Sequence, residues 1–338
     1  MKKKILLISV IFVLIVIIGA AGSLLYFDRK NGKTINSKEE YFILKNDTSI
    51  EDGAAALEKK KLIRSKKAFI YYAKYYKLQN SFKTGNYIIK GRTPMKDLLT
   101  KLQSGKGDFA IVTIPEGYTL YKISNTLEKA NLLKKDELLN TKLSDFDTKG
   151  LLSENQGVTF ELEGYLYPDT YYIPYNYDKT KIVSLMYDNF SKVFSAEYRE
   201  RAKQLGLSIN QVITIASLIE KEAANDAERS RIAGVIYNRI KKGMLLQIDA
   251  SVIYANTNGE NNIPNLTKDD LKKDSKYNSY VYKGLPPGPI ASPGKPSIEA
   301  ALYPEENDYL YYVAGPNGSV FSKTLEEHKR NVKKYLGK

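Results

Sequence analysis

The sequence predicts a mixed α+β protein in three parts: an N-terminal transmembrane helix, a small α+β module and a larger α+β domain. Three observations lead to this fold class. Residues 5–27 carry no charge, residues 46–67 and 116–137 resemble each other, and helical periodicity recurs in the second half of the chain. The predicted parts are a cytoplasmic tail (1–4), the membrane helix (5–27), a polar tether (28–40), the small module (41–107) and the larger domain (108–338).

The apolar run at residues 5–27 is long enough to cross a bilayer as a helix. Three lysines precede it, so the positive-inside rule places the N-terminus in the cytoplasm and the rest of the chain outside the cell membrane. A cleaved signal peptide is the alternative, because Gly19, Ala20 and Ala21 are small residues of the kind found at cleavage sites. The run continues past them to Phe27, which favours an uncleaved anchor.

Composition excludes several kinds of site. The 338 residues include no cysteine, so a disulfide scaffold, a thiolate metal site and a lipid-anchored lipoprotein are all excluded. The single histidine, His328, excludes multi-histidine metal sites.

The positive charge lies next to the membrane. Residues 1–107 hold 22 Lys and Arg against 8 Asp and Glu, whereas residues 108–338 hold 30 of each. The basic part could face anionic lipid or wall polymer, or it could be an ordinary solvated surface. Because the larger domain has no net charge, a nucleic-acid receptor is disfavoured despite the pI of 9.4.

The two similar segments, 46–67 and 116–137, align at an offset of 70 residues. Each reads as a turn, a short amphipathic helix, an apolar pair and a basic turn. Strands are expected at 41–45, 85–90 and 109–115. These elements predict the small α+β module and the start of the larger domain.

The larger domain is predicted to be mostly helical. An ordered loop with a short strand is expected at 161–174, and a strand at 309–314. The run GLPPGPIASPGKPS at 284–297 is too rich in proline and glycine for regular structure. Helices are expected at 179–204, 209–224, 226–242 and 325–336, the last with a capping-box pattern at Thr324 and Glu327.

Two glutamates end the helix predicted at 209–224. At about 100° per residue, Glu220 lies on the apolar face that includes Ile213 and Ala216, while Glu222 lies about 160° away. Glu220 should therefore point into the core or a cleft, and Glu222 into solvent. A carboxyl group in apolar surroundings favours its neutral form, which a general acid needs. The alternative is a buried ion pair with one of the arginines at 229, 231 and 239 on the next helix.

Four motifs of this chain resemble the endolytic murein transglycosylases of the YceG/MltG-like family. They are IASLIEKEAANDAERSRIAGVIYNRIKKGMLLQIDASVIYA (215–255), LEGYLYPDTYY (162–172), YNSYVYKGLPPGPIASPG (277–294) and YLYYVAGPNGSVFSKTLEEH (309–328). The motifs occur in the family's order over essentially the whole chain. The resemblance implies a membrane anchor, a LysM-like module and a larger α+β catalytic domain.

The resemblance also implies an activity. Family members are lyases that cut the MurNAc–GlcNAc β-1,4 bond within peptidoglycan glycan strands without water, leaving a 1,6-anhydro-MurNAc end. This reaction implies that the protein needs no metal or other cofactor. Cleavage of nascent strands would terminate their elongation, so membrane-bound peptidoglycan synthases are expected to act alongside. The family's catalytic glutamate falls on Glu220, which would act first as acid and then as base. A hydrolase would need a second carboxylate, for which Asp249 and Glu163 are the candidates.

The matching motifs indicate substrate-binding residues as well. Gln247 and Asp249 lie in the family's LQ-x-D-P stretch, although Ala250 stands here where the family commonly has proline. Tyrosine rings stack on sugars and asparagine can hydrogen-bond N-acetyl groups, but the same residues also serve ordinary packing. The candidates for substrate binding are Gln247, Asp249, Tyr277, Asn278, Tyr280 and Glu163.

Two questions stay open at this point. The module at 41–107 could bind N-acetyl sugars, or it could only space the larger domain from the bilayer. A membrane-anchored wall-binding protein without catalysis would use the same tyrosines and the same basic module. The inward position predicted for Glu220 argues against that second interpretation.

Overall fold

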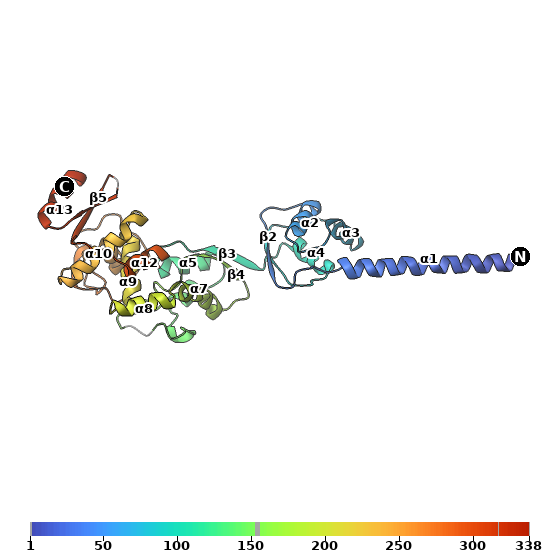
Figure 1. The fold of residues 1–338 in the computed structure, drawn as a ribbon, viewed down its shortest axis with the longest axis horizontal. Helices are drawn as coiled ribbons and strands as arrows, with labels where there is room; N and C mark the ends of the chain where they lie inside the picture. Colours follow the sequence, from blue (N-terminus) through green and yellow to red (C-terminus); the bar gives the residue numbers. More distant parts are fainter. Residues whose placement is uncertain (1, 153–155, 317, 338) are drawn as a thin grey trace. The chain divides into compact units, whose positions relative to one another are not determined.

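The computed structural model describes residues 2–152, 156–316 and 318–337 and divides the chain into two compact units, 1–110 and 111–338 (Figure 1). Both units mix helices with short strands, as predicted. The N-terminal unit contains α1 (Lys2–Asn31), β1 (Glu40–Leu44), α2 (Ile50–Lys59), α3 (Lys66–Tyr75), β2 (Gly85–Ile89) and α4 (Met95–Ser104).

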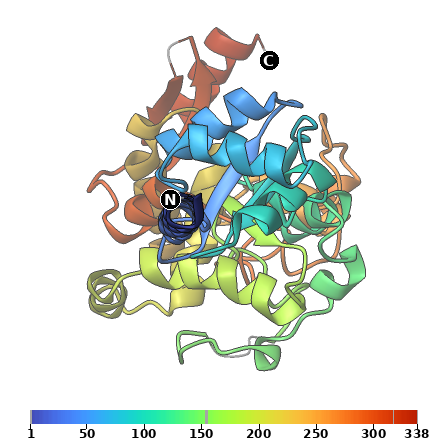
Figure 2. The same ribbon diagram turned by 90° about the vertical axis from the view of Figure 1, so that its right-hand side faces the viewer.

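Helix α1 extends from the folded part of its unit as a single apolar rod, seen end-on in Figure 2. Its segment Ile8–Asn31 is long and apolar enough to cross a membrane. The C-terminal end of α1 is packed against α3. The Phe27 ring contacts those of Tyr71 and Tyr72, and the Tyr72 hydroxyl donates to Asp28 at 2.8 Å. The predicted tether at 28–40 is therefore helical up to Asn31.

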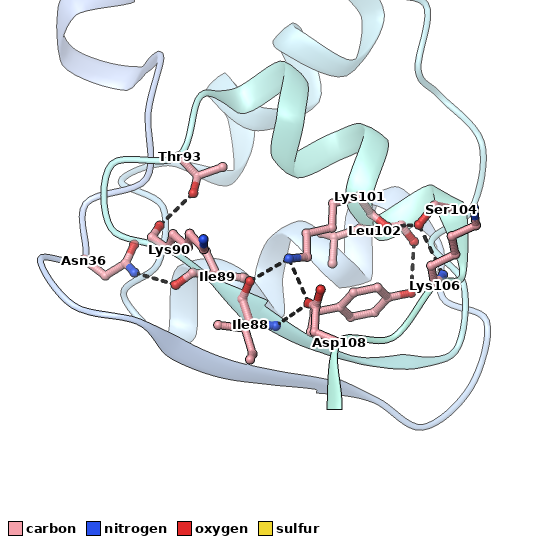
Figure 3. A network of polar contacts seen from close by, with 11 residues as sticks. Asn36, Ile88, Ile89, Lys90, Thr93, Lys101, Leu102, Ser104, Lys106 and Asp108 are labelled. Carbon is pink, nitrogen blue, oxygen red and sulfur yellow. Dashed lines mark hydrogen bonds and ion pairs between the residues drawn. The ribbon is translucent and has the colours of Figure 1, made fainter. Parts of the chain in front are cut away.

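The rest of the N-terminal unit is built around one antiparallel strand pair. β1 and β2 pair from Glu40↔Ile89 to Leu44↔Gly85, and their inward side chains pack with those of α2, α3 and α4. Figure 3 shows the polar contacts beside β2: Asp108 accepts the Ile88 amide at 2.7 Å and Lys101 at 2.8 Å. Lys101 also donates to the Ile88 carbonyl, so it closes a small network.

The sequence repeat is a structural repeat. α2 and α5 (Leu120–Lys129) are both capped by a hydroxyl side chain, Ser49 in the first and Thr119 in the second. Both helices are followed, 12 positions after the cap, by a residue with positive φ, Lys61 at 56° and Asn131 at 55°. The two copies fall in different compact units, so the repeated pattern specifies a local helix and its turn rather than a shared domain.

The second unit is mostly helical. Its elements are α5, α6 (Lys135–Leu139), β4 (Thr170–Pro174), α7 (Lys179–Val193), α8 (Ala196–Gln204), α9 (Ile209–Glu222), α10 (Asp226–Lys241), α11 (Asp249–Thr257), α12 (Lys295–Leu302), β5 (Tyr311–Gly315), β6 (Gly318–Ser322) and α13 (Leu325–Leu336). β4 pairs with β3 (Phe109–Thr113), and β5 with β6. Short 3₁₀ turns occur at Leu143–Asp145 and Asp270–Lys272.

Two predicted elements differ from the structure. The helix expected at 179–204 is two helices, because Phe194 leaves the helical path and Ser195 caps α8 by accepting the Tyr198 amide. The segment predicted to be irregular at 284–297 is irregular only to Gly294. This residue is the N-cap of α12, which begins at Lys295. Pro296 lies in its first turn, where a missing amide hydrogen has no helical partner to lose.

Helix α9 lies at the centre of the second unit, next to α10 and α12 (Figure 1). The sequence indicated one buried face, but all eight residues from Val212 to Ile219 are buried. A helix that is apolar on every side is typically surrounded by other elements. Because α9 is central, the side chains of both Glu220 and Glu222 contact neighbouring segments.

A glycine in α2 gives a test of the packing in the N-terminal unit. A Cβ on Gly53 would lie 2.2 Å from the ring of Phe82, which is completely buried. Gly53→Ala gains about 1 kcal/mol of helix propensity. We expect the clash to outweigh it and the free energy of unfolding to fall by about 1–3 kcal/mol net. Circular dichroism of the detergent-solubilised chain during heating measures this.

The double variant Gly53→Ala/Phe82→Leu is the control, because the smaller side chain relieves the clash. Its loss of stability should be smaller than the sum of the two single losses. A Gly53→Ala variant that melts at a higher temperature than the wild type would contradict this account of the packing.

Candidate functional site

The carboxyl group of Glu220 is buried at the junction of three helices. Its side chain is only 8% exposed, and Oε2 accepts hydrogen bonds from Ser297 Oγ at 2.7 Å, the Gly294 amide at 3.1 Å and Arg229 Nη1 at 3.2 Å. The inward position predicted from the helical wheel is confirmed. The ion pair considered as the alternative is also present, with Arg229 as the partner.

The three donors to Glu220 come from the start of α12 and from α10. Gly294 is the N-cap of α12 and Ser297 lies in the first turn, where free amides and the helix dipole favour an anion. Arg229 is itself only 11% exposed and also donates to Asp226 at 2.9 Å. All three bonds go to Oε2. Oε1 forms no hydrogen bond with any residue that the structure describes.

A second carboxyl group, that of Glu116, lies beside Glu220. Glu116 is in the turn after β3, and two backbone bonds fix this turn to the segment before α12: Gly117 N donates to Ser292 O and Ser292 N to Tyr118 O, both at 2.8 Å. A Cβ on Gly294 would lie 2.0 Å from Glu116 Oε1. Burial, and then the charge of Glu220, raise the pKa of Glu116.

Glu116 is not among the residues that the sequence predicts for the site. Its segment indicates only half of a repeat, and the helical periodicity that singles out Glu220 does not extend to a turn. The available signal is local: Pro115, Glu116 and Gly117 come shortly after an apolar strand, and functional side chains often lie in the loops after such elements. Only the tertiary contacts place this turn next to α9.

Three of the predicted substrate-binding residues lie together in a cavity that Glu220 does not line. Gln247, Asp249 and Tyr280 line a cavity of about 360 Å³. The Tyr280 hydroxyl donates to Asp249 Oδ1 at 2.6 Å. The cavity contains Glu222 rather than Glu220. Further lining residues are Arg239, Leu246, Tyr311, Tyr312, Leu325 and His328.

The prediction that Glu222 points into solvent is wrong. Its side chain is partly buried in this cavity, and Oε2 accepts the Tyr312 hydroxyl at 2.9 Å. Burial raises the pKa of Glu222, and the charge of Asp249 raises it further. The strand pair β5–β6 comes from nearly 90 residues downstream and covers this side of α9, a contact that a helical wheel cannot include.

The other three predicted site residues are buried within loops. The Asn278 side chain is completely buried and donates to the carbonyls of Leu271 and Lys273. Tyr277 is 4% exposed and packs on Tyr254. These side chains shape the loop before residue 284 and, as the structure has them, present no surface to a polymer.

Glu163 is also completely buried. Its two oxygens accept the Leu120 amide at 2.9 Å and the Tyr254 hydroxyl at 3.0 Å. Burial raises the pKa of Glu163 to about 8. It therefore ties the start of α5 to α11, and its position does not suit activation of water. Within the described ranges, no group of three or more His, Asp or Glu residues could hold a metal ion.

Known proteins resemble this chain along most of its length. The model of the YceG-like family matches residues 42–334. The endolytic murein transglycosylase of Bacillus subtilis is 37% identical, with 86% of this chain and 82% of that protein covered. The one from Streptococcus pneumoniae is 34% identical, covering 89% of this chain, which spans 59% of that longer protein.

A solved structure is similar as well. The crystal structure of a putative YceG-like protein from Listeria monocytogenes matches with a TM-score of 0.61 and 36% identity. The match covers 87% of this chain and 98% of that one.

The buried carboxyl of Glu163 predicts a dependence of stability on pH. Its pKa is about 8 in the folded chain against 4.5 as the ordinary value, so the folded chain binds more protons between these values. Its contribution to the free energy of unfolding therefore falls as pH rises from about 4.5 to 8. Urea unfolding at pH 5 and pH 8 should show a smaller decline for Glu163→Gln than for the wild type.

The Gln side chain keeps the shape and can still bond the Leu120 amide, so it removes the titration with little change in packing. The exposed Glu306→Gln is the control, and its decline should equal that of the wild type. Equal declines in all three proteins would show that Glu163 does not titrate in this range.

Proposed function

The chain belongs to the YceG-like family, and on this premise we propose that it is an endolytic lytic transglycosylase of peptidoglycan. It would cut the MurNAc–GlcNAc β-1,4 bond within glycan strands and leave a 1,6-anhydro-MurNAc end. The observation that carries the proposal is the Glu220 carboxyl group. Oε2 is anchored by three donors, and Oε1 is left for the substrate.

The anchoring of Glu220 suits proton transfer. The carboxyl plane is fixed by Arg229, Ser297 and the Gly294 amide. The side chain is therefore already ordered before Oε1 contacts a bound glycosidic bond, so binding costs it little further rotamer freedom. In the simplest scheme, Glu220 protonates the leaving oxygen of GlcNAc as the bond to MurNAc C1 breaks. The resulting carboxylate then takes the proton of the C6 hydroxyl, whose oxygen closes onto C1. No water is consumed.

The remaining predicted residues support substrate binding to different degrees. Gln247, Asp249 and Tyr280 line the cavity that contains Glu222, and we propose that it receives a part of the substrate other than the scissile bond. Glu163, Tyr277 and Asn278 would act indirectly, by holding the loops around α9 and α11 in place.

We further propose that α1 anchors the enzyme in the cell membrane with its N-terminus in the cytoplasm. The apolar segment Ile8–Asn31 and the lysines before it support this orientation. The catalytic unit would then face nascent strands beside membrane-bound synthases. The module at 41–107, with its antiparallel strand pair and packed helices, would be a LysM-like unit that orients the catalytic unit above the membrane.

Glu220→Gln tests the catalytic assignment. We expect loss of cleavage, measured as anhydro ends by mass spectrometry of digested peptidoglycan, because an amide cannot transfer the proton. Since Arg229 loses a charged partner but keeps Asp226, the free energy of unfolding should also fall by about 1.5–3 kcal/mol. Assays are therefore run well below the melting temperature of the variant.

Glu306→Gln is the control, since this glutamate is exposed and lies outside the proposed substrate-binding residues. It should retain most of the cleavage of the bond. Full activity in Glu220→Gln would remove that residue from the mechanism. A wild-type enzyme that leaves reducing ends would instead be a hydrolase, and one that leaves peptidoglycan intact would be a wall-binding protein.

Deletion of residues 1–22 tests the role of the anchor. This truncation keeps Phe27 and Asp28, which contact α3, so the module should stay folded. The soluble enzyme should cut purified glycan strands at the wild-type rate but lose activity in cells, because its local concentration at the membrane is lost. A folded truncation that is inert on purified strands would mean that the membrane or a partner completes the active site.

A further inference from the structure

The contacts of Glu220 raise the question of where the first proton comes from. Oε2 of Glu220 has two neutral donors and the Arg229 guanidinium, and it lies at the N-terminus of α12. These surroundings suit a base. The leaving oxygen of the glycosidic bond needs an acid.

Glu116 has the opposite surroundings. It is an exposed residue, and among the described residues its carboxyl group has no hydrogen bond and no ion pair. Although the residue is exposed, its neighbours partly desolvate the carboxyl group, and this desolvation, followed by the charge of Glu220, raises the pKa of Glu116. Two neighbouring carboxyl groups resist being charged together, and the one without donors is the better place for a shared proton.

The backbone holds the two carboxyl groups on either side of Gly294. The Gly294 amide donates to Glu220, while Glu116 Oε1 occupies the space that a Cβ at 294 would need. Gly117 next to Glu116 also faces Glu220: a Cβ there would lie 3.6 Å from Glu220 Cγ. Glu116 is thus fixed by its turn, not by a partner for its carboxyl group, which leaves that group available to a substrate.

We propose that Glu116 is a second catalytic residue, the acid that protonates the leaving oxygen, while Glu220 acts as the base toward the C6 hydroxyl. This inference rests on the proposed function and divides its two proton transfers between two residues. The Glu116 proton goes to the GlcNAc O4 as the C1–O4 bond breaks. The C6 hydroxyl proton goes to Glu220 as the C1–O6 bond forms, and passage of that proton back to Glu116 restores the enzyme.

Charged groups from several elements lie near Glu116 and Glu220. Lys221 lies next to Glu220 on α9, and its amine is near Gly117. Arg229 of α10 lowers the pKa of Glu116, whereas Asp226 of the same helix raises it. Tyr167 also interacts with Glu116, and Lys295 begins α12 beside Gly294. The loss of activity as pH rises should nevertheless follow the deprotonation of Glu116, since Glu116 is the group that must carry a proton.

Leaving-group chemistry tests the assignment. The full chain in detergent is assayed on intact peptidoglycan and on two aryl β-glycosides of a GlcNAc–MurNAc disaccharide, phenyl and 2,4-dinitrophenyl. Dinitrophenolate leaves without protonation, so it does not need the acid. Glu116→Gln should lose on the order of 10²–10⁴-fold in rate on peptidoglycan and the phenyl glycoside. It should stay within about tenfold of the wild type on the dinitrophenyl glycoside, without the alkaline decline.

Two other variants serve as controls. Glu220→Gln should lose activity on all three substrates, because the base is needed whatever the leaving group. Glu306→Gln, an exposed glutamate, should behave as the wild type. The melting temperature of Glu116→Gln should be unchanged, since its carboxyl group has no described partner.

The outcomes separate this inference from the function on which it rests. If the wild type forms anhydro ends and Glu116→Gln is fully active, or loses activity equally on both aryl glycosides, Glu116 is not the acid and the proposed function stands. If the wild type forms no anhydro ends from peptidoglycan, the proposed function itself fails.

Discussion

One oxygen atom, Oε2 of Glu220, connects the three helices on which the site depends. Glu220 lies in the last turn of α9, Arg229 comes from α10, and Ser297 and the Gly294 amide belong to the start of α12. Side chains this deeply buried cannot exchange these bonds for water without cost. The same contacts that stabilise the helix junction therefore orient the carboxyl group, so stability and the geometry of the site cannot be separated at this position.

The segment before α12 extends this constraint to the surrounding loops. The Ile290 amide donates to Ser217 Oγ in the middle of α9, and Ser292 pairs with the turn after β3 through two backbone bonds. Prolines limit the conformations of the unfolded segment, which lowers the entropic cost of ordering it. The segment before α12 is thus held firmly in place although it has no regular structure, and its bonds to the turn after β3 bring Glu116 next to Glu220.

The two sides of α9 carry carboxyl groups in different settings. Glu220 has a guanidinium partner and an anion-favouring helix terminus, whereas Glu222 has a tyrosine hydroxyl and a second carboxylate, that of Asp249, in its cavity. Sequence spacing separates them by only two residues. Their chemistry differs because different elements, α12 and the β5–β6 pair, cover the two sides.

The sequence by itself determined the features that depend on local patterns. The apolar run of α1, the capped helices of the repeat, the first residue of α9 and the inward direction of Glu220 follow from hydropathy, capping residues and a period of 3.6. Tertiary structure alone decided what each glutamate meets. The β5–β6 pair buried Glu222, loops enclosed Asn278 and Glu163, and a turn more than 100 residues away supplied Glu116. Periodicity reports the direction of a side chain from its own helix, whereas the partners that set its charge come from segments whose positions only the folded chain defines.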